Sequence, residues 1–209
     1  MVVMPMFPLG SVLLPGGVLP LHVFEPRYQA LVRHCMATEP HEFGVVLIER
    51  GREVGGGDQR LGVGVAARIV KVAELEAGQF AVLAVGTHRI RVDAWLPDAP
   101  YPLAEVTEWP DVADNANDAL SSAELIRSIA QRVRRASALA LELGDPQRLS
   151  TDELSDDPIL ASYQLAALAP LGPADGYQLL CAPTASARLE ALGAMLDDVE
   201  PMLQFRLRS

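Results

Sequence analysis

The segment at residues 7–28, FPLGSVLLPGGVLPLHVFEPRY, constrains the fold more than any other part of the chain. It contains one apolar run at residues 12–14, a Pro-Gly-Gly turn, and a second apolar run at residues 18–21. Short apolar runs on either side of such a turn are typical of buried strands. The segment therefore predicts two strands with a turn between them, and we expect Leu14 and Phe24 to be buried.

A helix is predicted to follow at residues 25–39. Pro26 stands directly after Glu25, and proline suits the first helical position because its missing N–H would have no partner there. Apolar side chains then recur three and four residues apart, as on the buried face of a helix. These side chains are Tyr28, Leu31, Val32, Cys35 and Met36. We expect an amphipathic helix that lies on a sheet.

Further strands are predicted where β-branched and alternating residues gather, at residues 43–49, 61–72, 80–95 and 103–109. Residues 76–79, Glu-Ala-Gly-Gln, have the length and the glycine of a hairpin turn, so the strands on either side should pair antiparallel. The glycine-rich residues 51–58 have no apolar periodicity and are predicted to form a mobile loop.

The composition changes at residues 110–118, PDVADNAND, where acidic and turn-forming residues replace β-branched ones. Beyond this stretch almost nothing has the pattern of a strand. We therefore place a domain boundary there, between a mainly β domain at residues 1–112 and a helical bundle at residues 118–209.

The carboxyl half is predicted to be helical between recognisable capping residues. Ser121 or Ser122 can cap the first helix, and Gly144 can end it. Asp157-Pro158 begins the next helix, whose inward side chains are expected to be Ile159, Leu160, Tyr163 and Ala167. A short helix through residues 177–180 and a longer one at residues 186–203 complete the bundle.

The opening segment, read as F-P-L-x-x-V-L-L-P-G-x-x-L-P-L-x-x-F-E-P-R-Y, resembles the start of the Lon amino-terminal domain, also called the Lon substrate-binding domain. Residues 58–65, DQRLGVGV, resemble the family's "vGtva" strand, and residues 86–92, GTHRIRV, its "G-x-x-R-x-r-i" strand. Leu179-Leu180 followed by Arg188-Leu189 resembles its "LLe…RL" helix pair. The resemblance covers nearly the whole chain.

This resemblance implies an α+β fold, with a PUA-like, mainly β amino-terminal domain followed by a small α-helical bundle. In the Lon family this region recognises damaged or unfolded polypeptide and helps to arrange subunits. The parent protease also carries an ATPase module with a phosphate-binding loop and a peptidase module with a Ser/Lys pair. The chain ends before either module could begin, so we expect a stand-alone Lon-domain protein.

Composition and charge narrow the cellular setting and the partners. The 209 residues are 50% hydrophobic, enough for a substantial core, and the net charge of −10 repels a phosphate backbone, which argues against nucleic acid. Cys35 and Cys181 lie among apolar helical neighbours, so we expect buried thiols and a reducing cytoplasm. No run approaches the ~20 apolar residues of a membrane span. We expect a cytoplasmic protein that does not bind membranes.

Catalytic motifs are missing from the sequence. The glycines at residues 55–57 lack the following Lys and Ser/Thr of a phosphate-binding loop, and Gly62-Val63-Gly64 lacks the third glycine of a dinucleotide site. The four histidines have no metal-ligand spacing, there is no C-x-x-C or G-x-S-x-G, and the only lysine is Lys71. His34 and Cys35 are adjacent and so point about 100° apart on a helix. We expect no catalytic residue, metal or cofactor.

Because the sequence shows no catalytic, metal or cofactor motif, we expect the protein to act by binding a partner. Our first hypothesis is a non-catalytic module for unfolded or damaged polypeptide, acting as an adaptor or regulator in protein quality control, with full-length Lon-type protease as a candidate partner. Glu25 and Arg27 are the candidate polypeptide contacts, because they flank the start of the first helix, although a solvated salt bridge explains them equally well. The alternatives are a PUA-like sensor of a small molecule or modified residue, and a peptidase. The oligomeric state stays open, with a weak homodimer as one option.

Overall fold

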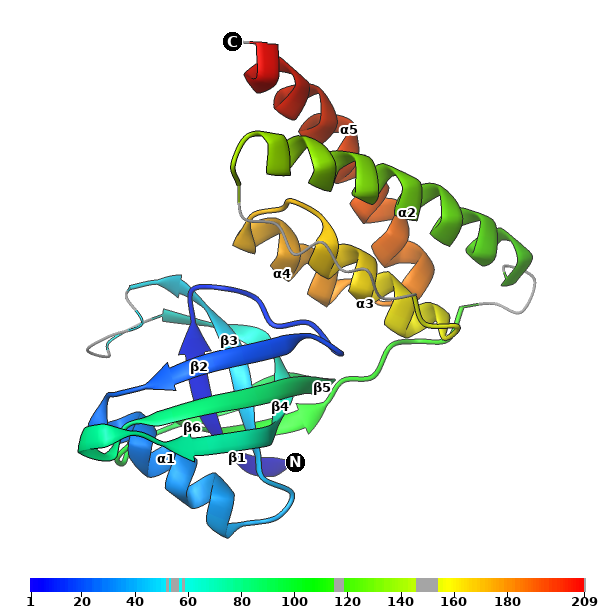
Figure 1. Ribbon diagram of the computed structural model, residues 1–209. Helices are drawn as coiled ribbons and strands as arrows, with labels where there is room; N and C mark the ends of the chain where they lie inside the picture. Colours follow the sequence, from blue (N-terminus) through cyan, green and yellow to red (C-terminus); the bar gives the residue numbers. More distant parts are fainter. Residues whose placement is uncertain (52, 54–56, 58, 115–118, 146–153, 209) are drawn as a thin grey trace. The chain divides into compact units, whose positions relative to one another are not determined.

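The structure is a computed structural model that describes all residues except 52, 54–56, 58, 115–118, 146–153 and 209. Its internal contacts divide the chain into two compact units, Met1–Pro110 and Asp111–Ser209 (Figure 1). The predicted order of a mainly β part followed by helices is confirmed. Most of the loop predicted at residues 51–58 falls outside the described residues.

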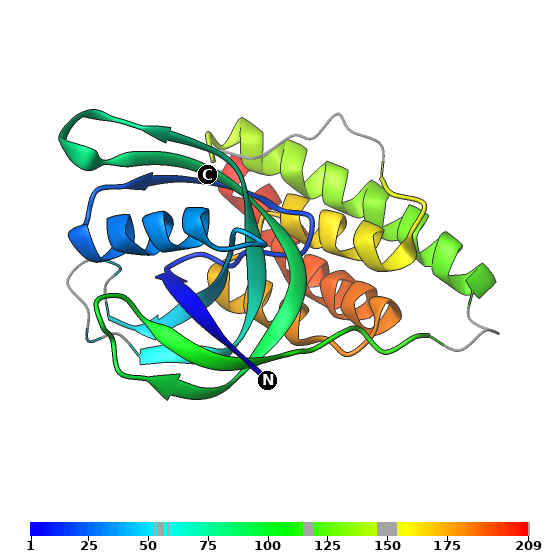
Figure 2. The same cartoon turned by 90° about the horizontal axis from the view of Figure 1, so that it is seen from below.

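The first unit is a six-stranded sheet with one long helix and a short 3₁₀ turn. Its elements are β1 (Val2–Leu9), β2 (Val18–Val23), α1 (Pro26–Ala37), β3 (Glu42–Arg50), β4 (Gln59–Glu74), η1 (Glu76–Gly78), β5 (Phe80–Leu96) and β6 (Leu103–Glu108). The strand order is β2-β5-β4-β3-β1-β6, and β5 also pairs with β6. The second pairing closes β5, β4, β3, β1 and β6 into a barrel, to which β2 is attached at the start of β5 (Figure 2).

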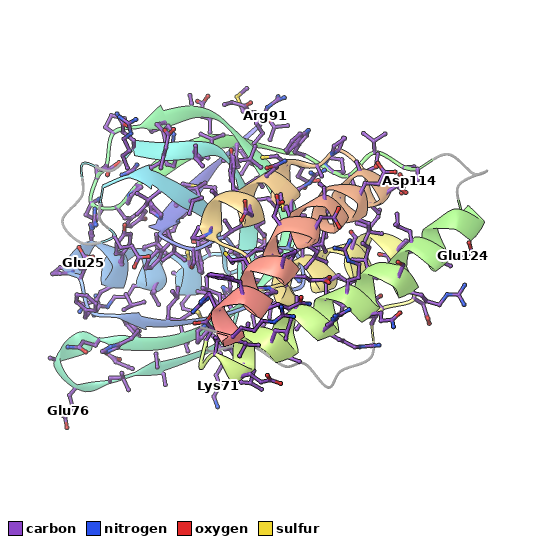
Figure 3. The ribbon with its side chains drawn as sticks, turned by 90° about the horizontal axis from the view of Figure 1, so that it is seen from above. Glu25, Lys71, Glu76, Arg91, Asp114 and Glu124 are labelled. Atoms are coloured by element: carbon purple, nitrogen blue, oxygen red, sulfur yellow. The ribbon has the colours of Figure 1, made fainter. Side chains whose placement is uncertain are left out.

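The hairpin predicted around residues 76–79 is confirmed. β4 and β5 pair antiparallel over most of their length, and η1 joins them with Gly78 at a φ of +71°. Glu76 marks the tip of this hairpin in Figure 3. Because β5 has 17 residues, its first half can pair with β2 while its second half pairs with β6.

The first strand lies earlier than predicted. Residues 12–14 form no strand, although Leu14 is buried as expected; the strand is β1, which contains Pro5 and Pro8. The register explains why both prolines are tolerated. β6 pairs with Val2–Pro5 only, and β3 pairs with Met6–Leu9 only, so each missing N–H faces a side where no strand is paired.

Two apolar clusters hold the first unit together. The barrel interior is filled by Met6, Val46, Ala66, Ile90, Ala104 and Val106. On the other face of β1 and β3, the Phe7 ring stacks on Tyr28 of α1 with centroids 4.0 Å apart. The prediction that Phe24 is buried is wrong: it lies between β2 and α1 and is 49% exposed.

Helix α1 begins at Pro26 as predicted and buries Tyr28, Leu31, Val32 and Cys35. Met36 was expected on the same face but is exposed. The helix ends at Ala37 because Pro40 disfavours helical backbone at the residue before it.

The second unit consists of α2 (Ala119–Glu142), α3 (Pro158–Leu168), α4 (Pro173–Cys181) and α5 (Ala185–Arg208). The carboxylate of Asp157 accepts from the N–H of Ile159, and Gly144 follows α2 at a φ of +79°, as the sequence predicted. Two details were wrong. α2 begins before Ser121, so neither Ser121 nor Ser122 is its cap. In α3, Ile159 and Ala167 are exposed, because this helix is apolar all round and its periodicity does not define a face.

A buried arginine organises the second unit. Arg188 of α5 has no exposed surface and donates to Leu179 O at 3.1 Å and to Ser162 Oγ and Tyr163 Oη, each at 2.7 Å. Its guanidinium also pairs with the carboxylate of Asp111. One charge pair therefore connects α3, α4 and α5 with the segment that follows β6.

Candidate functional site

The barrel wall is incomplete where β1 separates from β3. The amino-terminal half of β1 pairs with β6, and its carboxyl half pairs with β3, beginning at Met6 and Gly44. Met6 N–H donates to Pro102 O, which places the N–H and C=O of even-numbered residues of β1 on the β6 side. Val3 therefore directs its N–H and C=O toward the gap. Among the described residues, no strand pairs with Val3 on that side.

A groove of about 620 Å³ lies at this gap. It is bounded by the first residues of β1, the end of α1 with the following turn, the start of β3, and inward residues of β5 and β6. The lining consists of Met1, Val2, Val3, Met4, Pro5, His34, Cys35, Thr38, Glu39, Pro40, Glu42, His88, Ile90, Val106, Thr107 and Glu108.

Much of the groove surface is apolar. Its deepest side chains are Ile90 and Val106, which belong to the buried barrel interior. At its mouth, Val2 is 58% and Val3 is 55% exposed, which is unusual for β-branched residues in a strand. Exposed apolar residues that continue into a hollow are typical of a binding surface.

The polar rim of the groove is acidic. Glu39, Glu42 and Glu108 are among the lining residues, and in the described part of the chain no lysine or arginine lines the groove. The Glu42 carboxylate accepts from Arg68 at 2.8 Å, and the exposed Glu39 carboxylate lies 3.1 Å from His41 Nε2. The rim therefore favours a partner that brings cationic groups.

His88 presents one defined ring nitrogen to the groove. The Thr87 hydroxyl donates to Ala66 O at 2.9 Å and lies 3.0 Å from His88 Nδ1. Since the single hydroxyl proton is used on Ala66, Nδ1 of neutral His88 is the donor of this pair. Its Nε2 is then a hydrogen-bond acceptor for a ligand.

Cys35 lines the groove but is not poised to react. Burial raises the pKa of its thiol to about 12, so the nucleophilic thiolate is scarce at neutral pH. Its Sγ lies 3.3 Å from Glu42 O as a donor. Cys35 and Cys181 are both free thiols, as predicted, but only Cys35 is buried and Cys181 is half-buried. No group of three or more acidic, histidine or cysteine side chains within the described ranges could hold a metal.

Glu25 and Arg27 lie together at the start of α1, outside the groove lining (Figure 3 labels Glu25). Arg27 Nε donates to Glu25 Oε2 at 3.1 Å, Nη2 donates to Glu53 O at 3.1 Å, and the guanidinium covers the Tyr28 ring. Both side chains are largely covered. The two side chains thus form a salt bridge, largely covered where the sequence suggested a solvated one, and a role in polypeptide contact stays a prediction.

The sequence did not point to the groove, because the apolar residues at its mouth belong to β1. The first strand was predicted at residues 12–14, whereas β1 ends at Leu9. The apolar run Met1-Val2-Val3-Met4 was the available signal, but Pro5 and Pro8 close by concealed it. None of the helices in the described part is long and apolar enough to cross a membrane.

The fold is that of an α+β protein, with a grooved barrel in its first unit and helices in its second. Comparison with known proteins identifies the family. The description "ATP-dependent protease La (LON) substrate-binding domain" matches residues 3–198, and the chain belongs to this family.

Two solved structures and one curated relative illustrate the match. A Lon N-terminal domain protein from Xanthomonas campestris is 30% identical, with a TM-score of 0.64 over 93% of this chain and 98% of that chain. The N-terminal domain of Mycobacterium avium complex Lon protease is 22% identical, with a TM-score of 0.65 over 94% and 98%, and supports the fold alone. Lon protease of Anaeromyxobacter dehalogenans is 32% identical over 68% of this chain.

The curated relatives are much longer proteins. The chain spans between 14% and 26% of their length. The family assignment therefore concerns the substrate-binding region, and the activities of the complete proteases do not follow from it.

Proposed function

We propose that this chain binds unfolded or damaged polypeptide in the groove and does so without catalysis. The observation that carries the proposal is an open apolar groove in a member of a substrate-binding family. Unfolded chains expose apolar side chains that folded proteins bury, so a hollow lined by exposed Val2 and Val3 distinguishes the two states.

The cellular role we propose is that of an adaptor or regulator in protein quality control, with a full-length Lon-type protease as the second partner. Its relatives that match include Lon proteases of several bacteria, which supports this pairing. Degradation of a common client by purified Lon-type protease, with and without this chain, tests the role. A degradation rate that does not depend on this chain would remove the adaptor role and leave binding itself untouched.

The binding test compares two states of one client. A fluorescent protein that can be held unfolded by reduction of its disulfides is titrated in both states, and anisotropy is recorded. We expect a Kd in the micromolar range, about −8 kcal/mol, for the unfolded state and weaker binding for the folded state. Val2→Asp should weaken binding, because it places an uncompensated carboxylate in an acidic apolar mouth, whereas Val112→Asp, at an exposed site in the second unit, should not. Equal affinity for the two client states would contradict the proposal.

A small-molecule or modified-residue sensor is the second candidate. The groove volume of about 620 Å³ lies within the range of ligand pockets, and His88 offers a hydrogen-bond acceptor beside apolar walls. A thermal-shift screen with a metabolite panel tests this candidate. A ligand that raises Tm and competes with unfolded client would place both functions in one groove.

Peptidase activity is the third possibility that the sequence left open. Casein digestion with and without ATP separates it from binding. We expect no turnover, and cleavage that persists after repurification would overturn the non-catalytic proposal.

A further inference from the structure

We propose that the bound polypeptide adds as a short β-strand to the gap beside β1, pairing with Val3, and that it carries a basic side chain toward Glu108. This inference rests on the proposed function, and it specifies how the groove recognises its client. It follows from the backbone of β1, from the alternation of its side chains and from the charge of the rim.

The backbone argument begins with the register of β1. Phe7 and Leu9 direct their N–H and C=O groups toward β3. Backbone groups alternate in direction along a strand, so Val3, which is also odd-numbered, directs its N–H and C=O to the same side. The paired part of β3 opposite β1 begins only at Gly44, so the N–H and C=O of Val3 face the groove. An edge of this kind is a template for another strand. Addition of an extended segment to it gives affinity through main-chain hydrogen bonds, whatever the client sequence.

Pro5 limits where such a strand can bond. It has the same orientation as Val3 but provides no N–H, and its carbonyl faces Gly44 N–H, because the parallel ladder of β1 and β3 begins at the pair Met6–Gly44. An added strand therefore has one full pair of bonds, at Val3, and none at Pro5. Binding through so few bonds is weak and reversible, as release of a client requires.

The side chains of the added strand would alternate between two environments. One set faces Ile90 and Val106 through the gap, where apolar groups are favoured. The other set faces the end of α1. A client with apolar residues at every second position fits this arrangement, and such segments are buried in folded proteins.

The charge of the rim selects the residues that flank the apolar positions. Glu108 is exposed at the end of β6, on the same side of that strand as Val106, and Glu39 stands across the groove at the end of α1. Arg68 is bound to Glu42, and the lining residues that the structure describes include no arginine or lysine. Arginine or lysine in the client complements this rim, and an acidic client is repelled.

The backbone part is tested with a short fluorescent peptide of alternating valine and threonine that ends in arginine. We expect it to compete with the unfolded protein, and a copy with N-methyl groups on its bonding edge to bind about fivefold more weakly, since a lost hydrogen bond costs on the order of 1 kcal/mol. Val3→Pro should weaken binding of the unmethylated peptide to a similar extent. Val3→Ala retains the N–H and should weaken this binding less. Pro5 shows that β1 tolerates proline in this orientation, and circular dichroism checks that Val3→Pro is folded.

The charge part uses a matched pair of variants on β6. Replacing the peptide arginine by glutamate should weaken binding to the unaltered protein. Glu108→Gln should reduce this preference, and Glu105→Gln, on the same strand but outside the lining, should leave it unchanged.

The outcomes separate the two proposals. If the unfolded client binds but the methylated and unmethylated peptides bind with equal affinity, strand addition is overturned and the proposed function stays in place. An arginine preference that survives in Glu108→Gln would overturn the assignment of the basic position. Failure of the protein to bind any unfolded client would remove the proposed function itself.

Discussion

Individual side chains in the first unit differ in burial in ways that give direct tests. Leu14 and Phe24 lie ten residues apart around β2, yet Leu14 is 6% exposed and Phe24 is 49% exposed. A carboxylate at a buried site must lose its hydration without gaining a partner, whereas at an exposed site it stays in water. The two positions therefore predict opposite results for the same substitution.

Leu14→Asp should unfold the first unit, because the cost of several kcal/mol is comparable with a total stability of about 5–15 kcal/mol. Phe24→Asp should lower Tm only slightly. Circular dichroism and thermal melts of the two variants check this. A Leu14→Asp protein that melts like the unaltered one would show that the side chain reaches solvent.

The Cys35 thiol makes stability depend on alkaline pH. Burial raises its pKa from about 9 to about 12, so in that window the unfolded chain loses the thiol proton while the folded chain retains it. The free energy of unfolding should therefore fall as pH rises above 9, by up to about 1.4 kcal/mol per pH unit from this group. Urea titrations of the unaltered protein and of Cys35→Ala at several pH values measure the difference. Identical pH dependence in both proteins would contradict the assignment.

At the scale of elements, the strands come closest where glycine occupies the barrel wall. A Cβ on Gly64 of β4 would overlap the carbonyl oxygen of Val45 in β3, whereas a Cβ on Gly62 would meet nothing within 4 Å. The Gly62-Val63-Gly64 sequence thus has a packing role at its second glycine, one of the roles that sequence alone favours for glycine in a strand.

Gly64→Ala should destabilise the first unit by about 1–3 kcal/mol, because a backbone carbonyl cannot move aside as a flexible side chain can. Gly62→Ala should change stability by no more than about 0.5 kcal/mol. Denaturant unfolding of both variants measures the contrast. Equal losses would mean that the approach of β3 to β4 is not tight at Gly64.

The elements were predictable to different degrees for physical reasons. β3 to β6 and the β4–β5 hairpin follow from alternation, β-branched residues and one turn glycine, which are local signals. β1 was missed because its two prolines look like strand breakers until the register shows which sides are unpaired. The groove was missed for the same reason, since a gap between strands depends on pairing and cannot be read from residue order.

At the scale of the molecule, the sequence predicts the boundary between the two units at residues 110–118. In the structure, Val112 N–H donates to Pro183 O, and Asp114 accepts from Ser186 N–H at 3.2 Å. Asp111 also holds the buried Arg188. Residues 111–114 therefore belong to the helical unit, which begins at Asp111.

We expect residues 1–110 to fold alone, because the barrel and α1 supply a core of domain size. The helical unit should need Asp111. Residues 111–209 should melt cooperatively, whereas residues 118–209 leave the Arg188 charge buried without its carboxylate, at a cost of about 3–5 kcal/mol. Thermal melts of the three fragments test this. Equal stability of 111–209 and 118–209 would show that the pair contributes little, and an unfolded 1–110 fragment would show that the units depend on each other.

The acidic rim of the groove also affects self-association of this protein at high concentration. An open strand edge invites a second copy to pair with it, which is the first step of ordered aggregation. Two copies that met edge to edge would bring Glu39 and Glu108 of each against the same carboxylates of the other. Like charges at close range repel each other, so the carboxylates that attract a basic client also oppose self-association of the protein.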